Sequence, residues 1–162
     1  MNIKASVFFV CVLFVSEARA RLGETPEQLT NRFGQPTGRS DENITSQGRV
    51  YKIGDNYGFE QEDWRIRSVI IDGRCAKISY TKSGEWTEDQ IRTVLAGSAQ
   101  GDTWMLVSKP AYMKFQRRWT RSDKAVAEWN ANAFTITHPA YDRAEEIAKA
   151  KAKADASRKP NI

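Results

Sequence analysis

The sequence predicts an α+β fold in which helices pack on one face of an antiparallel sheet, arranged as two tandem halves of one helix followed by strands. Two segments carry helix start and stop signals, and each precedes several short segments rich in β-branched and aromatic residues. Consecutive strands favour an antiparallel sheet, because a parallel sheet needs helices that alternate with strands. The Asp72-Gly73 pair between two apolar segments is a strong hairpin signal.

The first 20 residues predict a secretory signal peptide. They combine Lys4, an apolar run over residues 5–15 and the small-x-small cleavage site Ala18-Arg19-Ala20. The apolar run is much shorter than the roughly 20 residues that a membrane-spanning helix needs. We therefore expect an exported protein, periplasmic or secreted from a bacterial source, with no transmembrane segment after cleavage.

Cleavage leaves residues 21–162, a length that suits one domain with its own core. We expect this domain over residues 21–139, with halves at about 21–82 and 83–139. Cys75 is the one cysteine after residue 20, so it is either a buried thiol in a strand or the source of an intermolecular disulfide.

The first helix is predicted within residues 25–36. It belongs to the stretch from Leu22 to Pro36, which reads LGETPEQLTNRFGQP. Thr25 is a good N-cap and Gln28 completes a capping box with it, while the Pro between them suits the first helical position. Leu29 and Phe33 form an apolar stripe, and the Gly and Pro that follow stop the helix.

The second helix is predicted over residues 87–97, where Thr87 and Gln90 form the same capping box and Gly97 supplies the stop. The two segments share a Thr, an acid, a Gln and apolar residues at matching positions. This similarity predicts an internal repeat.

The strand segments follow the two helices in order. They are residues 50–53, 64–80, 103–107, 113–121, 125–129 and 134–137. In the central hairpin, a strict two-residue turn places Ile70 and Cys75 on one face and most other apolar residues on the other. Either both faces of the hairpin are covered, or a bulge shifts the register.

Residues 140–162 predict a solvated, Ala- and Lys-rich helical tail with one well-oriented pair, Glu145 and Lys149. The tail holds five basic residues from Lys149 onward against Asp155, whereas residues 21–148 hold 18 basic and 18 acidic residues. The basic pI of about 9.3 therefore belongs to the tail, and no nucleic-acid partner is expected. The tail is either a contact for anionic surfaces or a solubilising end.

The stretch from Gly23 to Leu29, with Phe33-Gly34-Gln35-Pro36 after it, resembles the Gly-Met-Thr-x-x-Gln-Val…Leu-Gly-x-Pro pattern of small exported bacterial domains. That pattern occurs in the β-lactamase inhibitor protein and in a small outer-membrane lipoprotein of the barrel-assembly machinery, which also carry a turn similar to Asp72-Gly73-Arg74. Glu24 stands where the pattern has Met. The resemblance implies a helix-plus-sheet module, often in tandem, that binds other proteins and does not catalyse.

Catalytic chemistry has few sources in the chain. A thiolate nucleophile would need Cys75 beside His138, the one histidine. Residues 54–63 form an acidic loop without the ligand spacing of a calcium site, and Glu60, Glu62 and Asp63 in it are the carboxylates for an alternative function, a small secreted hydrolase. No cofactor and no metal site are expected.

The best candidate for binding lies around residues 114–121. Strand alternation places Phe115, Arg117, Trp119 and Arg121 on one face, and such mixtures of aromatic rings and guanidinium groups are common at interfaces. In the alternative arrangement, the aromatic residues pack inward and the arginines extend to solvent. We expect a non-catalytic module that binds another exported or envelope protein, with Arg117, Trp119 and Arg121 as the candidate contact face.

Overall fold

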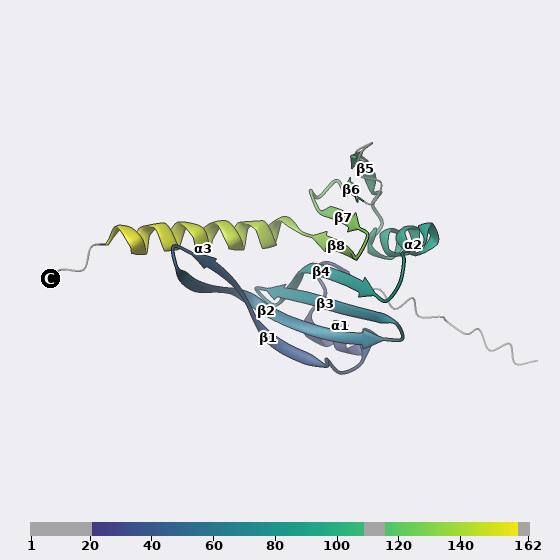
Figure 1. Cartoon of the computed structure of the whole chain (residues 1–162), viewed down its shortest axis with the longest axis horizontal. Coiled ribbons are helices and arrows are strands. Elements are labelled where there is room, and N and C mark those ends of the chain that lie inside the picture. The colour runs from purple at the N-terminus through teal and green to yellow at the C-terminus, as the bar shows by residue number, and fades with distance from the viewer. Residues whose placement is uncertain (1–20, 109–115, 159–162) are drawn as a thin grey trace, which may run out of the picture.

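The computed structural model describes residues 21–108 and 116–158 and shows one antiparallel sheet with three helices. The eight strands of the described part lie in the order β1-β2-β3-β4-β8-β7-β6-β5, so the fold class is α+β as predicted (Figure 1). In chain order the elements are α1 (Pro26–Phe33), β1 (Gly38–Ser46), β2 (Arg49–Gln61), β3 (Trp64–Ile71), β4 (Arg74–Lys82), α2 (Glu88–Ser98), β5 (Met105–Ser108), β6 (Gln116–Thr120), β7 (Val126–Asn130), β8 (Ala133–Thr137) and α3 (Pro139–Ser157).

Two helices open the two halves of the chain, and both have the predicted capping box. Thr25 and Gln28 cap α1 reciprocally, and Thr87 and Gln90 do the same for α2. The stop at Gly97 was wrong, because α2 continues through this buried glycine to Ser98. Local hydrogen bonds start each helix, whereas the glycine inside α2 is buried and does not end it.

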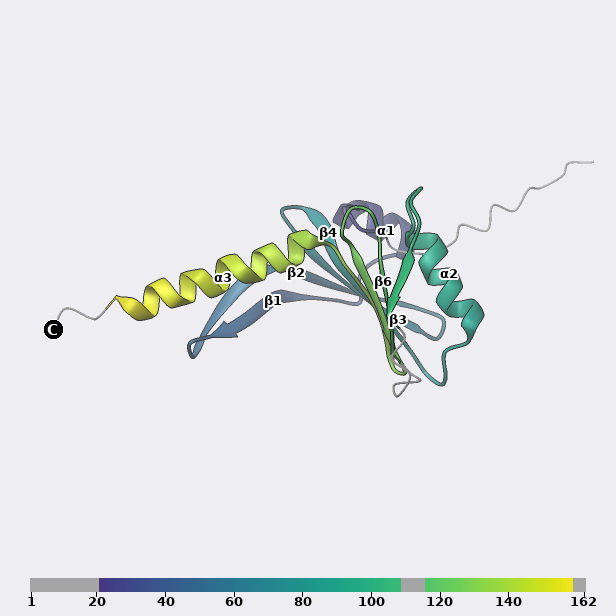
Figure 2. The ribbon, with the colours of Figure 1, turned by 90° about the horizontal axis from the view of Figure 1, so that it is seen from above.

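The main core lies between the sheet and the two capped helices. Leu29 and Phe33 of α1 and Ile91 and Val94 of α2 are buried in it, and Figure 2 shows these helices at one end of the molecule with α3 extending away from them. We call this side of the sheet the inner face. Its strand residues are Tyr57, Phe59, Ile66, Ile70, Cys75, Ile78, Tyr80, Trp119, Ala127, Trp129, Phe134 and Ile136.

The sequence left two alternatives for the central hairpin, a bulge that shifts its register or coverage of both its faces. The structure has both. Asp72 and Gly73 both have positive φ, as a type I′ turn requires, and the register shifts between Val69 and Ile70. The shift keeps Cys75 and Ile78 together on the inner face. A second, smaller cluster on the outer face contains Val69, Ile71, Ala76 and Tyr141. The hairpin is thus bulged and covered on both sides.

Helix α3 is less solvated than the sequence predicted. Tyr141, Ala148 and Ala152 are buried, and the Tyr141 hydroxyl donates a hydrogen bond of 2.8 Å to Glu42 of β1. Burial, followed by the hydrogen bond to Glu42, raises the pKa of Tyr141 well above its usual value. The predicted pair of Glu145 and Lys149 forms, with 2.9 Å between its atoms.

The prediction of an acidic loop at residues 54–63 is wrong, because strand β2 runs through this segment to Gln61. Its inward residues Tyr57 and Phe59 enter the core, and its backbone pairs with β1 on one side and β3 on the other. Strand β1, GRSDENITS, was not predicted because it has only one apolar residue, Ile44. Both strands are held by main-chain pairing with the neighbouring strands of the sheet and not by an apolar pattern of their own.

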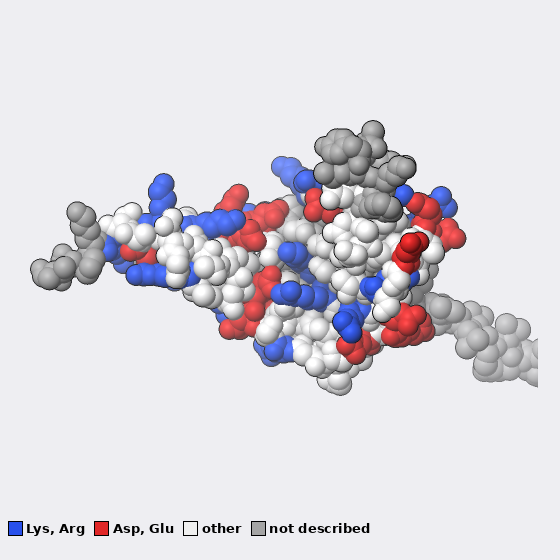
Figure 3. All heavy atoms as spheres, in the orientation of Figure 1, with Lys and Arg blue, Asp and Glu red and all other residues white. Residues whose placement is uncertain are grey.

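Some predictions lie outside the described residues, namely the signal peptide at 1–20 and the position of Phe115. In the described part, no helix is long and apolar enough to cross a membrane. Figure 3 shows acidic and basic side chains interspersed over the visible face, in keeping with the balanced charge of the domain.

Gly54 is the glycine whose replacement we expect to disturb the sheet. A Cβ atom on it would lie 2.4 Å from the main-chain oxygen of Ile70, so Gly54→Ala forces the backbone of β2 and β3 apart. We expect a loss of about 2 kcal/mol in the free energy of unfolding, measured by urea denaturation. Gly38→Ala is the matched control in the same sheet, since a Cβ there meets no atom within 4 Å. Equal stability of the two variants would contradict this account of β2.

Candidate functional site

The three residues of the predicted contact face point to the inner face of the sheet. Trp119 is 7% exposed and stacks on Phe134 with ring centroids 5.7 Å apart. The Arg117 guanidinium lies 5.1 Å from the ring centre of Trp129 and donates to the Glu88 carboxylate of α2, with one distance of 2.8 Å. These contacts fasten β6 to α2 within the domain.

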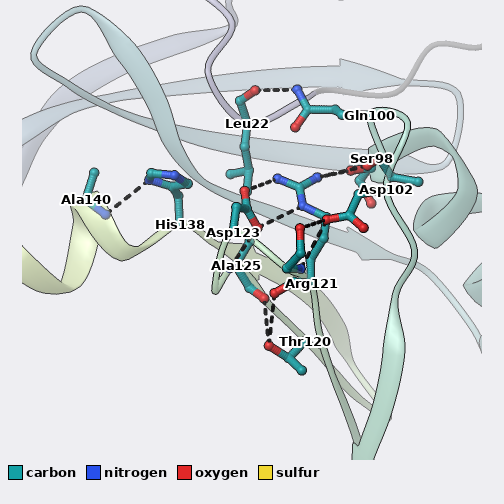
Figure 4. Close-up of polar contacts among 12 residues, drawn as sticks. Leu22, Ser98, Gln100, Asp102, Thr120, Arg121, Asp123, Ala125, His138 and Ala140 are labelled. Carbon is teal, nitrogen blue, oxygen red and sulfur yellow. Dashed lines mark hydrogen bonds and ion pairs between the residues drawn. The ribbon is translucent and has the colours of Figure 1, made fainter.

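Arg121 is buried, with 5% of the residue exposed. Its guanidinium bonds both carboxylate oxygens of Asp123, at 3.0 Å from Nε and 2.6 Å from Nη2, and this pairing lowers the pKa of Asp123 (Figure 4). Nη1 donates to the main-chain oxygen of Ser98 at 2.6 Å, where the last turn of α2 concentrates negative partial charge. Neither predicted arrangement holds for this arginine, because it neither joins an exposed face nor extends to solvent.

A cavity of about 440 Å³ lies beside this arginine. Five segments meet there, contributing Gly23, the hairpin turn at Asp72, Gln100 after α2, Asp123 between β6 and β7, and His138 before α3. His138 is the N-cap of α3, and its Nδ1 accepts a hydrogen bond of 3.2 Å from the backbone N–H of Ala140. The proton of the neutral imidazole therefore sits on Nε2.

Cys75 lines the same cavity, which brings it near His138. It is a free, buried thiol, as one of the two predicted alternatives has it, and its Sγ lies 3.6 Å from the main-chain oxygen of Lys77. Burial raises the pKa of the thiol to about 12. A thiol in this state is not the thiolate that a nucleophilic dyad needs.

The carboxylates of the alternative hydrolase do not converge. The Glu60 side chain is 61% exposed and lies 3.9 Å from Arg65, while Glu62 and Asp63 are exposed in the turn between β2 and β3. Hydrolysis by paired carboxylates needs one of them in an apolar pocket that raises its pKa. These three residues do not form such a pocket.

The strongest candidate for a contact surface is strand β5, at the edge of the sheet beyond β6. Its three apolar residues Met105, Leu106 and Val107 are 58%, 54% and 59% exposed. Leu106 pairs with Trp119, and the register then shifts so that Ser108 pairs with Arg118. The sequence predicted a strand here but no site. The available signal was three consecutive apolar residues without the alternation of a half-buried strand.

Comparison of the sequence with models of protein families and with curated proteins gives no match. Among solved structures, the chain is similar to a cysteine-rich secretory protein from Staphylococcus aureus subsp. aureus Mu50, at 11% identity and a TM-score of 0.45. The alignment covers 72% of this chain and 44% of that protein, so the chain spans less than half of its length.

The buried arginine gives the first prediction from this region. Arg121→Met leaves the Asp123 carboxylate and the Ser98 carbonyl without their cation, and we expect a loss of about 3 kcal/mol in the free energy of unfolding. Arg118→Met is the control, on strand β6 directly before Arg121. Its side chain is 54% exposed beside Glu128, so this change is expected to cost less than about 1 kcal/mol. Chemical denaturation of both variants measures the difference, and similar losses would argue against a special role of Arg121.

The buried thiol of Cys75 leads to a second prediction, about its reactivity. A rise of the pKa from 9.0 to about 12 lowers the thiolate fraction of Cys75 about a thousandfold. We expect iodoacetamide at pH 8 to leave Cys75 of the folded protein unmodified over a time in which Cys75 of the urea-unfolded chain reacts completely, as followed by mass spectrometry of the peptide that contains it. Comparable rates in the two states would show that Cys75 is accessible and activated.

Proposed function

We propose that this protein is exported, periplasmic or secreted, and acts as a non-catalytic module that binds an extended segment of another exported protein along β5. The observation that carries the proposal is the exposure of more than half of each apolar residue, Met105, Leu106 and Val107, on an edge strand. An edge strand offers unpaired N–H and C=O groups, and an added strand satisfies them.

The two edges of the described sheet differ in a way that supports this assignment. Strand β1, at the opposite edge, carries exposed charged residues such as Arg39 and Asp41 and only one apolar residue. Charged side chains are the usual protection of an edge against pairing with other chains. Strand β5 lacks this protection over Met105 to Val107, so pairing is favoured at this edge.

The chemistry of β5 defines the partner. Leu106 pairs with inner-face Trp119, and Met105 pairs with Thr120 on the outer face, so β5 presents apolar side chains toward both faces. An added strand with apolar residues on both faces would cover them and remove them from water. The partner is therefore an extended, largely apolar segment, for which main-chain hydrogen bonds supply affinity and side chains supply specificity.

Two features of the sequence agree with this proposal. The residues at 1–20 have the pattern of a cleaved signal peptide, which would bring the chain to other exported proteins. The capped first helix and the Asp72-Gly73 turn resemble domains that act by binding proteins. These domains often occur in tandem, and we include in the proposal the internal repeat predicted from the two capping boxes.

Site-specific cross-linking tests the proposal. A photoreactive residue at Leu106, introduced in the native host, is expected to form a covalent adduct with another envelope or secreted protein. Ile147 on α3 is the matched control, because it is 70% exposed and apolar but lies outside the sheet edge. Leu106→Lys with Val107→Lys should then weaken binding of the identified partner at least tenfold, since charges at an edge oppose strand addition. Equal adducts from both positions, or none from Leu106, would contradict the proposal.

A further inference from the structure

The first residues after the predicted cleavage site are fixed to the domain. The main-chain N–H of Gly23 donates to the oxygen of Cys75, and the N–H of Cys75 donates to the oxygen of Glu24, both at 2.8 Å. Leu22 is 4% exposed, and its main-chain oxygen accepts a hydrogen bond of 2.7 Å from the Gln100 side chain (Figure 4). These bonds to β4 and to the end of α2 hold the backbone on which Arg21 sits.

The Glu24 carboxylate faces the backbone nitrogen of Arg21. Its side chain is 11% exposed, and its Oε1 accepts from Nε and Nη2 of Arg32 at 3.1 and 2.5 Å. Its other oxygen, Oε2, lies 3.0 Å from the main-chain nitrogen of Arg21. Arg74, another cation on this side of the domain, donates to the main-chain oxygen of Gly23 at 3.2 Å. One carboxylate thus has one oxygen on a guanidinium and the other on the first main-chain nitrogen after Ala20.

We infer that Glu24 is the binding site for the α-ammonium group that cleavage after Ala20 creates at Arg21. A processing peptidase hydrolyses the Ala20–Arg21 amide with one water, leaving a carboxylate on Ala20 and an amine on Arg21 that takes up a proton at neutral pH. The atom 3.0 Å from Glu24 Oε2 then changes from a neutral amide donor to a cation. Charge-assisted hydrogen bonds are stronger than neutral ones, so the processed chain is the more stable one.

This inference rests on the export and cleavage that the proposed function includes, and it gives a role to Glu24. The residue replaces the Met of the exported domains that the helix resembles. At this position a carboxylate serves both Arg32 of α1 and the new chain end. Removal of the signal peptide would therefore also stabilise the folded domain.

Two forms of the otherwise unchanged chain test the inference, one beginning at Arg21 and one beginning at Ala20. Both are released from a cleavable N-terminal fusion. In the longer form, the ammonium lies one residue, about 3.8 Å of chain, further from its place, and an amide N–H again faces Glu24. We expect the folding equilibrium constant from urea denaturation to fall about fivefold, equivalent to about 1 kcal/mol. A difference below twofold would overturn the inference.

Glu24→Gln shows whether the carboxylate is responsible, because it keeps an acceptor oxygen and removes the charge. In this background the two chain starts should be equally stable, and a persisting fivefold difference would assign the effect to another group. The first comparison needs no substitution, so it decides the matter even if Glu24→Gln does not fold. The mass of the protein isolated from its native host tests the cleavage itself, so failure of the export proposal is distinguishable from failure of the ion pair.

Discussion

The pairing of β4 with β8 is the contact on which the rest of the structure depends. It joins the strands of the first half of the chain to those of the second, and it places Ile78 opposite Ile136 and Tyr80 opposite Phe134 on the inner face. The two isoleucines and the phenylalanine have no exposed surface. Because these residues are more than 50 positions apart, this contact carries a high loop-closure cost that burial of the common core must offset.

The consequences of this pairing extend beyond the two strands. The N–H of His138, just after β8, donates to the main-chain oxygen of Ala76 in β4, so the start of α3 is fixed by the same junction. It also brings the β6–β7 turn, the end of α2 and the start of the domain together around one cavity. A small domain thereby gains one continuous core for two capped helices that are too short to be stable alone.

The sequence was most informative where structure is encoded locally. The capping boxes at Thr25 and Thr87 and the Asp72-Gly73 turn involve residues within three positions of one another, and all were predicted. Strand β1 and the second part of β2 were missed because polar segments become strands only through their neighbours in the sheet. The same limit applies to the candidate site. The alternation of Arg117, Trp119 and Arg121 was visible, but Glu88 and the carbonyl of Ser98, which hold the arginines inside the fold, are contributed by α2.

The unequal edges of the sheet have a consequence for the complex proposed at β5. A sheet that accepts strands at both edges can add copies without limit, as open filaments do. Here the charged β1 edge opposes addition, and the apolar β5 edge is short, four residues from Met105 to Ser108. Under the proposed function, growth through strand pairing would therefore stop after one partner has been added. If β5 binds a partner as proposed, the asymmetry of the two edges would favour a complex of defined stoichiometry over an open filament.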